Sequence, residues 1–147
     1  MGLHWQYGVV QNASGAAALA VSIIEDGSAP LDEVVEHAAA AGSGSFTSNS
    51  GGVPTWDISV VATGGSGSYT YTWSNNEVDD PQGVYSVNSV GTTNAARYNT
   101  MSITGSMPAS ASDPPNACVY ELSCRVQDGA GGDITVQRNM SFVAIGL

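Results

Sequence analysis

The chain has 147 residues, which is the size of one domain or of a small domain with an arm. Only 11% of its residues are charged; thirteen are acidic, three are arginine and none is lysine, so the formal net charge is −10. A surface of this charge repels phosphate backbones and anionic lipids, which argues against nucleic-acid binding and membrane attachment. No stretch approaches the roughly 20 apolar residues of a membrane-spanning helix.

The first residues lack the pattern of a secretory leader. Residues 1–7 contain no Lys or Arg, and the apolar run 16–24 leads into Glu25-Asp26-Gly27 instead of a small-residue cleavage site. We therefore expect the protein to be made and used without Sec export.

Residues 1–51 are predicted to form an N-terminal arm with one short helix. The apolar run 19–24 is too short for periodicity to distinguish strand from helix, although its similarity to the later segment ISVV favours a strand. A proline followed by two carboxylates then has the pattern of a helix start, which predicts a helix over 30–41 ended by Gly42. Glycine and serine dominate the residues that follow, as in flexible linkers, so we place the folded domain at 52–147.

The domain at 52–147 is predicted to be all-β. Apolar and polar side chains alternate over 55–62 and 118–127, and aromatic and hydroxyl side chains alternate over 69–74. Such alternation is typical of strands with one face in the core, and Gly, Ser, Asn and Pro mark the turns between them. About seven such strands indicate an immunoglobulin-like β-sandwich. The residues expected in its core are Trp56, Ile58, Val60, Tyr71, Trp73, Tyr120, Leu122, Cys124 and Val126.

The two cysteines, Cys118 and Cys124, fall in one predicted strand. Six residues of strand separate them by about 20 Å, whereas a disulfide needs Cα atoms within about 7 Å. We expect two buried free thiols that act as small hydrophobic side chains.

Two segments resemble PKD-like domains, a branch of the immunoglobulin-like sandwiches. The segment TGGSGSYTYTWS at 63–74 resembles the entry into the tryptophan-bearing strand of that family, and YELSCRVQDG at 120–129 resembles its late strand and turn. The resemblance makes Trp73 the core tryptophan and places Tyr120 near the tyrosine-corner position. Two features depart from the pattern: NNEV replaces the acidic-glycine signature after the tryptophan, and residues 55–62 contain no cysteine that could pair with Cys124.

Sandwiches of this kind occur in bacterial surface proteins and in bacteriophage capsid, decoration and tail proteins. The resemblance therefore implies a virion structural protein, assembled in the host cytoplasm, of the capsid decoration or cement type. Its expected partners are major capsid or tail subunits and further copies of the chain. The residues expected to contact partners, through the arm and the termini, are Leu3, Trp5, Tyr7, Val34, Val35, Ile145 and Leu147.

A carbohydrate-binding or host-adhesion module is the alternative. Tyr69 and Tyr71 alternate with hydroxyl residues and are expected in the core. If both instead faced solvent, they would form the aromatic strip on which sugar rings stack.

The sequence predicts no catalytic, cofactor-binding or metal-binding residues. The histidines, His4 and His37, lie in different predicted elements, and no motif has metal-ligand or triad spacing. Carboxylates at 77–80 and at 128–133 have the oxygen chemistry that calcium prefers, but solvated turn carboxylates are the simpler interpretation. We therefore expect no enzymatic activity and no cofactor.

Overall fold

The structure is a computed structural model that describes residues 17–25, 29–47, 56–88, 96–98 and 102–147. These residues form ten strands and no helix. In chain order the strands are β1 (Ala20–Glu25), β2 (Val34–Ala39), β3 (Ser45–Thr47), β4 (Ile58–Thr63), β5 (Tyr69–Asp79), β6 (Ser86–Asn88), β7 (Arg97–Tyr98), β8 (Ser102–Ser106), β9 (Asn116–Asp128) and β10 (Asp133–Gly146).

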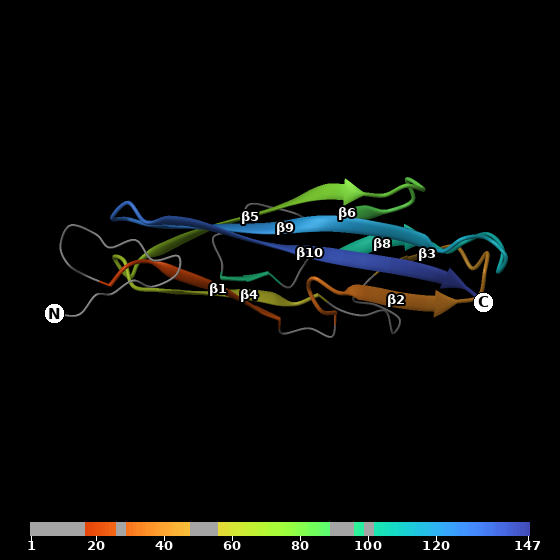
Figure 1. Ribbon diagram of the computed structural model, residues 1–147, viewed down its shortest axis with the longest axis horizontal. Helices are drawn as coiled ribbons and strands as arrows, with labels where there is room; N and C mark the ends of the chain where they lie inside the picture. Colours follow the sequence, from red (N-terminus) through yellow and green to blue (C-terminus); the bar gives the residue numbers. More distant parts are fainter. Residues whose placement is uncertain (1–16, 26–28, 48–55, 89–95, 99–101) are drawn as a thin grey trace.

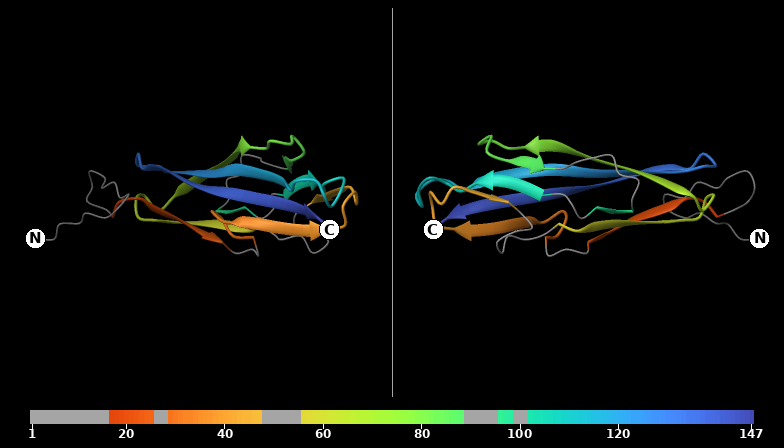
Figure 2. Two further views of the ribbon diagram at one scale, coloured as in Figure 1. Left: turned by 45° about the vertical axis from the view of Figure 1, so that its right-hand side comes forward. Right: turned by 180° about the vertical axis from the view of Figure 1, so that it is seen from behind.

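The strands form three sheets. A four-stranded sheet has the order β2-β10-β9-β5, in which β2 runs parallel to β10 and the other neighbours are antiparallel. Two three-stranded sheets have the orders β1-β4-β7 and β3-β8-β6. Figure 1 shows β1 and β4 beneath the large sheet, and the view from behind in Figure 2 shows β8 (cyan) in front of β9 and β10. This all-β arrangement is consistent with a β-sandwich.

A single hydrophobic core joins the sheets. Its largest fully buried side chains include Trp56, Trp73 and Phe142. The ring centroid of Phe142 on β10 lies 5.2 Å from that of Phe46 on β3 and 5.8 Å from that of Trp56. Because aromatic contacts of this kind add about 0.5–1.5 kcal/mol each beyond area burial, they hold β3 and the residue Trp56, which precedes β4, against the large sheet.

The side chain of Asp128 links two neighbouring turns, the one that follows β9 and the one between β4 and β5. Its carboxylate accepts the N–H groups of Gly132 at 2.7 Å and Ala130 at 2.8 Å within its own turn, and that of Ser66 at 3.2 Å from the β4–β5 turn. These donors, Gly132 first, hold the pKa of Asp128 below its usual value. Gly65 has a φ of +58°, and a Cβ there would lie 1.9 Å from the Asp128 carboxylate, so only glycine fits.

The helix predicted over 30–41 is wrong, because residues 34–39 form strand β2. Val35 is buried, and the ring of His37 lies 5.0 Å from that of Phe46, so alternate side chains enter the core. Asp32 adopts a left-handed conformation with φ of 60°; its N–H donates to the carbonyl of Asn139 at 2.8 Å and its Oδ1 accepts the N–H of Asn139 at 2.8 Å. Because a short isolated helix is marginal in water, pairing with a distant strand outweighs the local helix signals.

The described part of residues 1–51 does not form a separate arm. β1 pairs with β4, β2 with β10 and β3 with β8, so each strand before residue 48 joins a strand that follows residue 56. Residues 17–25 and 29–47 are therefore parts of the same sheets as the predicted domain. The similarity of 21–24 to 58–61 correctly favoured a strand, because both segments are strands, and they are neighbours.

Candidate interaction surface

The outer face of the large sheet divides into two unlike halves. Alternate residues of each strand point away from the core, and the strand register places them in rows across the sheet. One row contains Val34, Ser141 and Val119; the next contains Glu36, Val143 and Ala117. A third row pairs Ala38 with Ile145.

Six apolar side chains fill most of these three rows, and we call them the C-terminal patch. Val34 is 58% exposed, Ala38 is exposed and the others are half-buried. Strand spacing gives the patch a size of about 13 Å along the strands and about 10 Å across them. Its members are Val34 and Ala38 from β2, Ala117 and Val119 from β9, and Val143 and Ile145 from β10.

The chain end borders the C-terminal patch. The N–H of Leu147 donates to the carbonyl of Ala39 at 2.9 Å, and the N–H of Ala41 donates to the carbonyl of Leu147 at 3.2 Å. These bonds fix the backbone of Leu147 beside β2, while its side chain remains 73% exposed. Figure 1 shows the C-terminus at the end of β2 and β10.

The other half of the outer face, which we call the polar half, is made of hydroxyl, amide and charged side chains. The Nε atom of Arg125 donates to Asp133 at 2.9 Å, and Nη2 of Arg125 also contacts Asp133. The amide of Gln137 donates to Glu121 at 3.2 Å. The hydrogen bonds from Arg125 lower the pKa of Asp133 and raise that of Arg125. These polar groups bond one another along the surface. The polar half comprises Thr70 and Thr72 from β5, Glu121, Ser123, Arg125 and Gln127 from β9, and Asp133, Thr135 and Gln137 from β10.

The predicted partner-contact residues lie in different environments. Val34 and Ile145 belong to the C-terminal patch, and Leu147 lies beside it. Val35 is only 4% exposed and packs in the core, so its prediction as a contact residue is wrong. The reason is the strand geometry of β2, which sends neighbouring side chains to opposite faces. The predicted contacts Leu3, Trp5 and Tyr7 lie outside the described residues.

The predicted core residues all lie on inward faces of their strands or directly before one. Tyr71 is half-buried against the core, and the others are buried, namely Trp56, Ile58, Val60, Trp73, Tyr120, Leu122, Cys124 and Val126. Cys118 and Cys124 are free and buried, as predicted. Burial raises the pKa of each thiol to about 12, so neither forms a thiolate near neutral pH.

The aromatic strip required for sugar stacking does not face solvent. Tyr69 and Tyr71 share the inward face of β5 with Trp73, and both pack against the core. The hydroxyl of Tyr69 donates to the carbonyl of Gly64 at 2.8 Å. The specific feature that would favour the carbohydrate-binding alternative is therefore missing from this strand.

The groups considered for catalysis or calcium binding have structural partners. The N–H of Tyr85 donates to Asp80 at 2.9 Å, and the hydroxyl of Tyr120 donates to Glu77 at 3.3 Å. His37 packs against Phe46, and His4 lies outside the described residues. Among the described residues, no group of three or more His, Cys, Asp or Glu side chains is placed to hold a metal ion. The same residues include no helix long and apolar enough to cross a membrane.

Sequence reasoning did not predict the C-terminal patch as one surface. The run 142–147 contains no polar residue. A strand that is apolar on both faces is typically covered on both faces, so this run was the sequence signal for the patch. Assignment of 30–41 to a helix hid the contribution of β2. Comparison of the sequence with protein-family models and with curated proteins finds no match.

Proposed function

We propose that the fold is an immunoglobulin-like β-sandwich of the PKD-like kind. Trp73 on β5 is buried directly opposite Cys124 on β9, and a buried tryptophan on strand C, which packs against the cysteine position of a neighbouring strand, is a hallmark of immunoglobulin sandwiches. β2, which runs parallel to the last strand, completes the four-stranded layer. One detail departs from the family pattern: the hydroxyl of Tyr120 bonds the side chain of Glu77, whereas a tyrosine corner bonds backbone.

On this fold, we propose a non-enzymatic structural protein that binds a neighbouring protein subunit through the C-terminal patch. The observation that carries the proposal is the patch itself, since six apolar side chains from three strands are gathered on the surface of a chain with net charge −10. The largest contiguous apolar patch on a soluble monomer typically measures about 300–600 Å² and is often a functional surface. The PKD-like resemblance implies the assembly: a bacteriophage virion, in which the chain is a decoration or cement subunit.

The size of the patch sets the strength of the contact. If about 300 Å² of apolar surface is buried, the gain is about 7.5 kcal/mol before the cost of association. Because that cost is itself about 4–15 kcal/mol, one patch binding one site gives weak attachment. Attachment to an ordered array, where several copies or contacts act together, supplies the additional effective concentration. A decoration subunit on a lattice satisfies this requirement.

Incorporation into particles tests the proposal. The gene is replaced in its source genome by the double variant Val34→Glu/Ile145→Glu, particles are purified, and copies of the chain per particle are measured by quantitative mass spectrometry. We expect the wild-type chain in the particles and at least a tenfold loss for the double variant, because two buried carboxylates oppose apolar docking.

The matched control is Thr72→Glu/Thr135→Glu, which adds the same charge to the polar half of the same sheet. We expect it to enter particles at the wild-type level. Circular dichroism of all purified chains shows that each variant is folded. Absence of the wild-type chain from particles contradicts the virion assignment, and equal incorporation of both double variants contradicts the role of the patch.

A further inference from the structure

The outer face of β1 and β4 is a second unusual surface. The register pairs Ala20 with Thr63, Ser22 with Val61 and Ile24 with Ser59, and these six side chains point away from the core. All six are uncharged, in a chain with net charge −10. We call this surface the neutral face. It belongs to a different sheet from the C-terminal patch.

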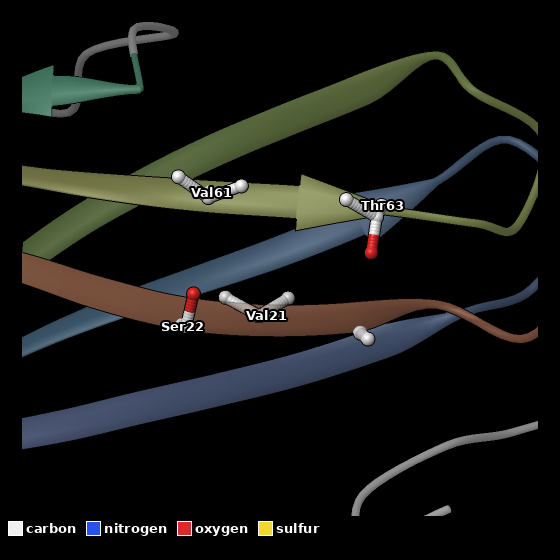
Figure 3. Close-up of a pocket in the computed structure, with 5 residues that line it drawn as sticks. Val21, Ser22, Val61 and Thr63 are labelled. Atoms are coloured by element: carbon white, nitrogen blue, oxygen red, sulfur yellow. The ribbon is translucent and has the colours of Figure 1, made fainter.

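The neutral face carries both a projection and a hollow. Ile24 is 43% exposed near the end of β1. Toward the other end of the same strand, a shallow hollow of about 140 Å³ lies between β1 and β4. Figure 3 shows Val21 and Ser22 on β1 and Val61 and Thr63 on β4 around it; Ala20 also lines it. The neutral face therefore carries both a projecting side chain and a hollow that could receive such a side chain.

We propose that two copies of the chain associate through their neutral faces, with Ile24 of each copy seated in the hollow of the other. A two-fold axis that crosses the strands at Ser22 makes the two β1 strands antiparallel. It places Ile24 over Ala20 of the partner copy and Ala20 over its Ile24. Such an arrangement is isologous, because the same patch serves both subunits.

The projection and the hollow on one face fit a second copy, and charge favours this face for the contact. Two chains of charge −10 repel at most orientations, and the least repulsion occurs where uncharged faces meet. The carboxylates nearest in sequence, Glu25, Asp26 and Asp57, all adjoin the Ile24–Ser59 end in the sequence. The antiparallel arrangement places the two Glu25 backbones about 20 Å apart, which is more than twice the Debye length of about 8 Å at physiological ionic strength.

The expected association is weak and increases with salt. The neutral face is smaller than the roughly 800 Å² that each partner buries in a standard interface, so we expect a Kd on the order of 0.1 mM. Salt screens the remaining repulsion between the acidic bodies while leaving the apolar contact intact. The dimer fraction should rise between low salt and 0.5 M NaCl, opposite to the behaviour of an interface held by ion pairs.

Sedimentation equilibrium of the full chain up to about 1 mM tests the proposal with matched variants. Val61→Glu and Val78→Glu each replace an exposed valine by a carboxylate, since Val61 is 42% exposed and Val78 on β5 is 57% exposed. We expect at least a tenfold weaker dimer for Val61→Glu and an unchanged dimer for Val78→Glu. A wild-type chain that stays monomeric at these concentrations, or a dimer that Val61→Glu leaves intact, overturns the proposal.

A cysteine placed on the axis gives an independent measurement. Ser22→Cys should form a covalent dimer with a short bismaleimide cross-linker, because the two positions face each other on the two-fold axis across the roughly 10 Å between packed sheets. Ile24→Cys should form little, because its two positions lie about 13 Å apart along the strand direction. The native thiols are buried and do not interfere. Equal cross-linking at both positions overturns the arrangement; loss of the dimer in Ile145→Glu alone assigns it to the C-terminal patch and likewise overturns it.

Discussion

The two halves of the outer face of the large sheet share strands β9 and β10 and their hydrogen-bonded ladder, yet their side chains interact differently with water. In the polar half, side chains bond one another, as Arg125 does with Asp133 and Gln137 with Glu121. In the C-terminal patch, apolar side chains cover the same kind of backbone. The backbone hydrogen bonds of the ladder are formed in both halves. The halves therefore differ in what we expect to cover them: solvent covers the polar half, and another protein covers the C-terminal patch.

The inner and outer sides of β10 give the sharpest test of that comparison. Phe142 faces the core and touches Phe46 and Trp56, so Phe142→Ala should destabilise the fold by about 3–5 kcal/mol. Ile145 lies on the outer side of the same strand and is only half-buried, so Ile145→Ala should reduce the free energy of unfolding by about 1–2 kcal/mol. Urea denaturation measures both values. Similar losses for the two variants would mean that the patch serves folding instead of binding.

Acidification should destabilise the end of the large sheet that contains Asp128. Asp128 has a lowered pKa in the folded chain, so its contribution to stability is present above its unfolded pKa of about 3.9 and is lost as pH falls through the folded pKa. Asp128→Asn should lower stability at pH 7 and flatten the decline of stability below pH 4. Thermal denaturation between pH 2 and 7 measures the effect. Parallel pH profiles for wild type and Asp128→Asn contradict the assignment.

The two buried thiols report separately on the two halves. Cys118 lies behind the C-terminal patch, between Ala117 and Val119, and Cys124 lies behind the polar half, between Ser123 and Arg125. Neither thiol should react with a maleimide at pH 7 in the native wild-type chain, because both are buried and protonated. In Asp128→Asn, labelling of Cys124 should accelerate several-fold more than labelling of Cys118, as measured by peptide mass spectrometry. Equal acceleration would show that the sheet opens as one unit.

The strands predicted best are those whose signal is local. Alternation over β5 and β9 predicted that Trp73 and Cys124 would face the core, and both are buried. Residues 30–41 failed because Pro30, Asp32 and the alanines favour a helix locally, whereas the decisive partner is Asn139, 107 residues away. The patch was similarly inaccessible to local reasoning, since the parallel register of β2 on β10 is what brings its residues together. The sequence nevertheless placed Ile145 and Leu147 of this apolar terminus among the predicted partner contacts.

The smallest expected effect concerns the ion pair of the polar half. Arg125 and Asp133 are both substantially exposed, and exposed pairs contribute little to stability because solvent screens them. Arg125→Ala should therefore leave the urea midpoint unchanged within error while raising the pKa of Asp133 toward its ordinary value, which carboxyl NMR measures directly. An unchanged urea midpoint together with a raised pKa of Asp133 shows that the two side chains of this ion pair interact in solvent without contributing to the stability of the fold. A large loss of stability would instead make the ion pair structural, and the contrast with the patch would then rest on the hydrogen bonds from Gln137 to Glu121 and from Gln127 to Asp133.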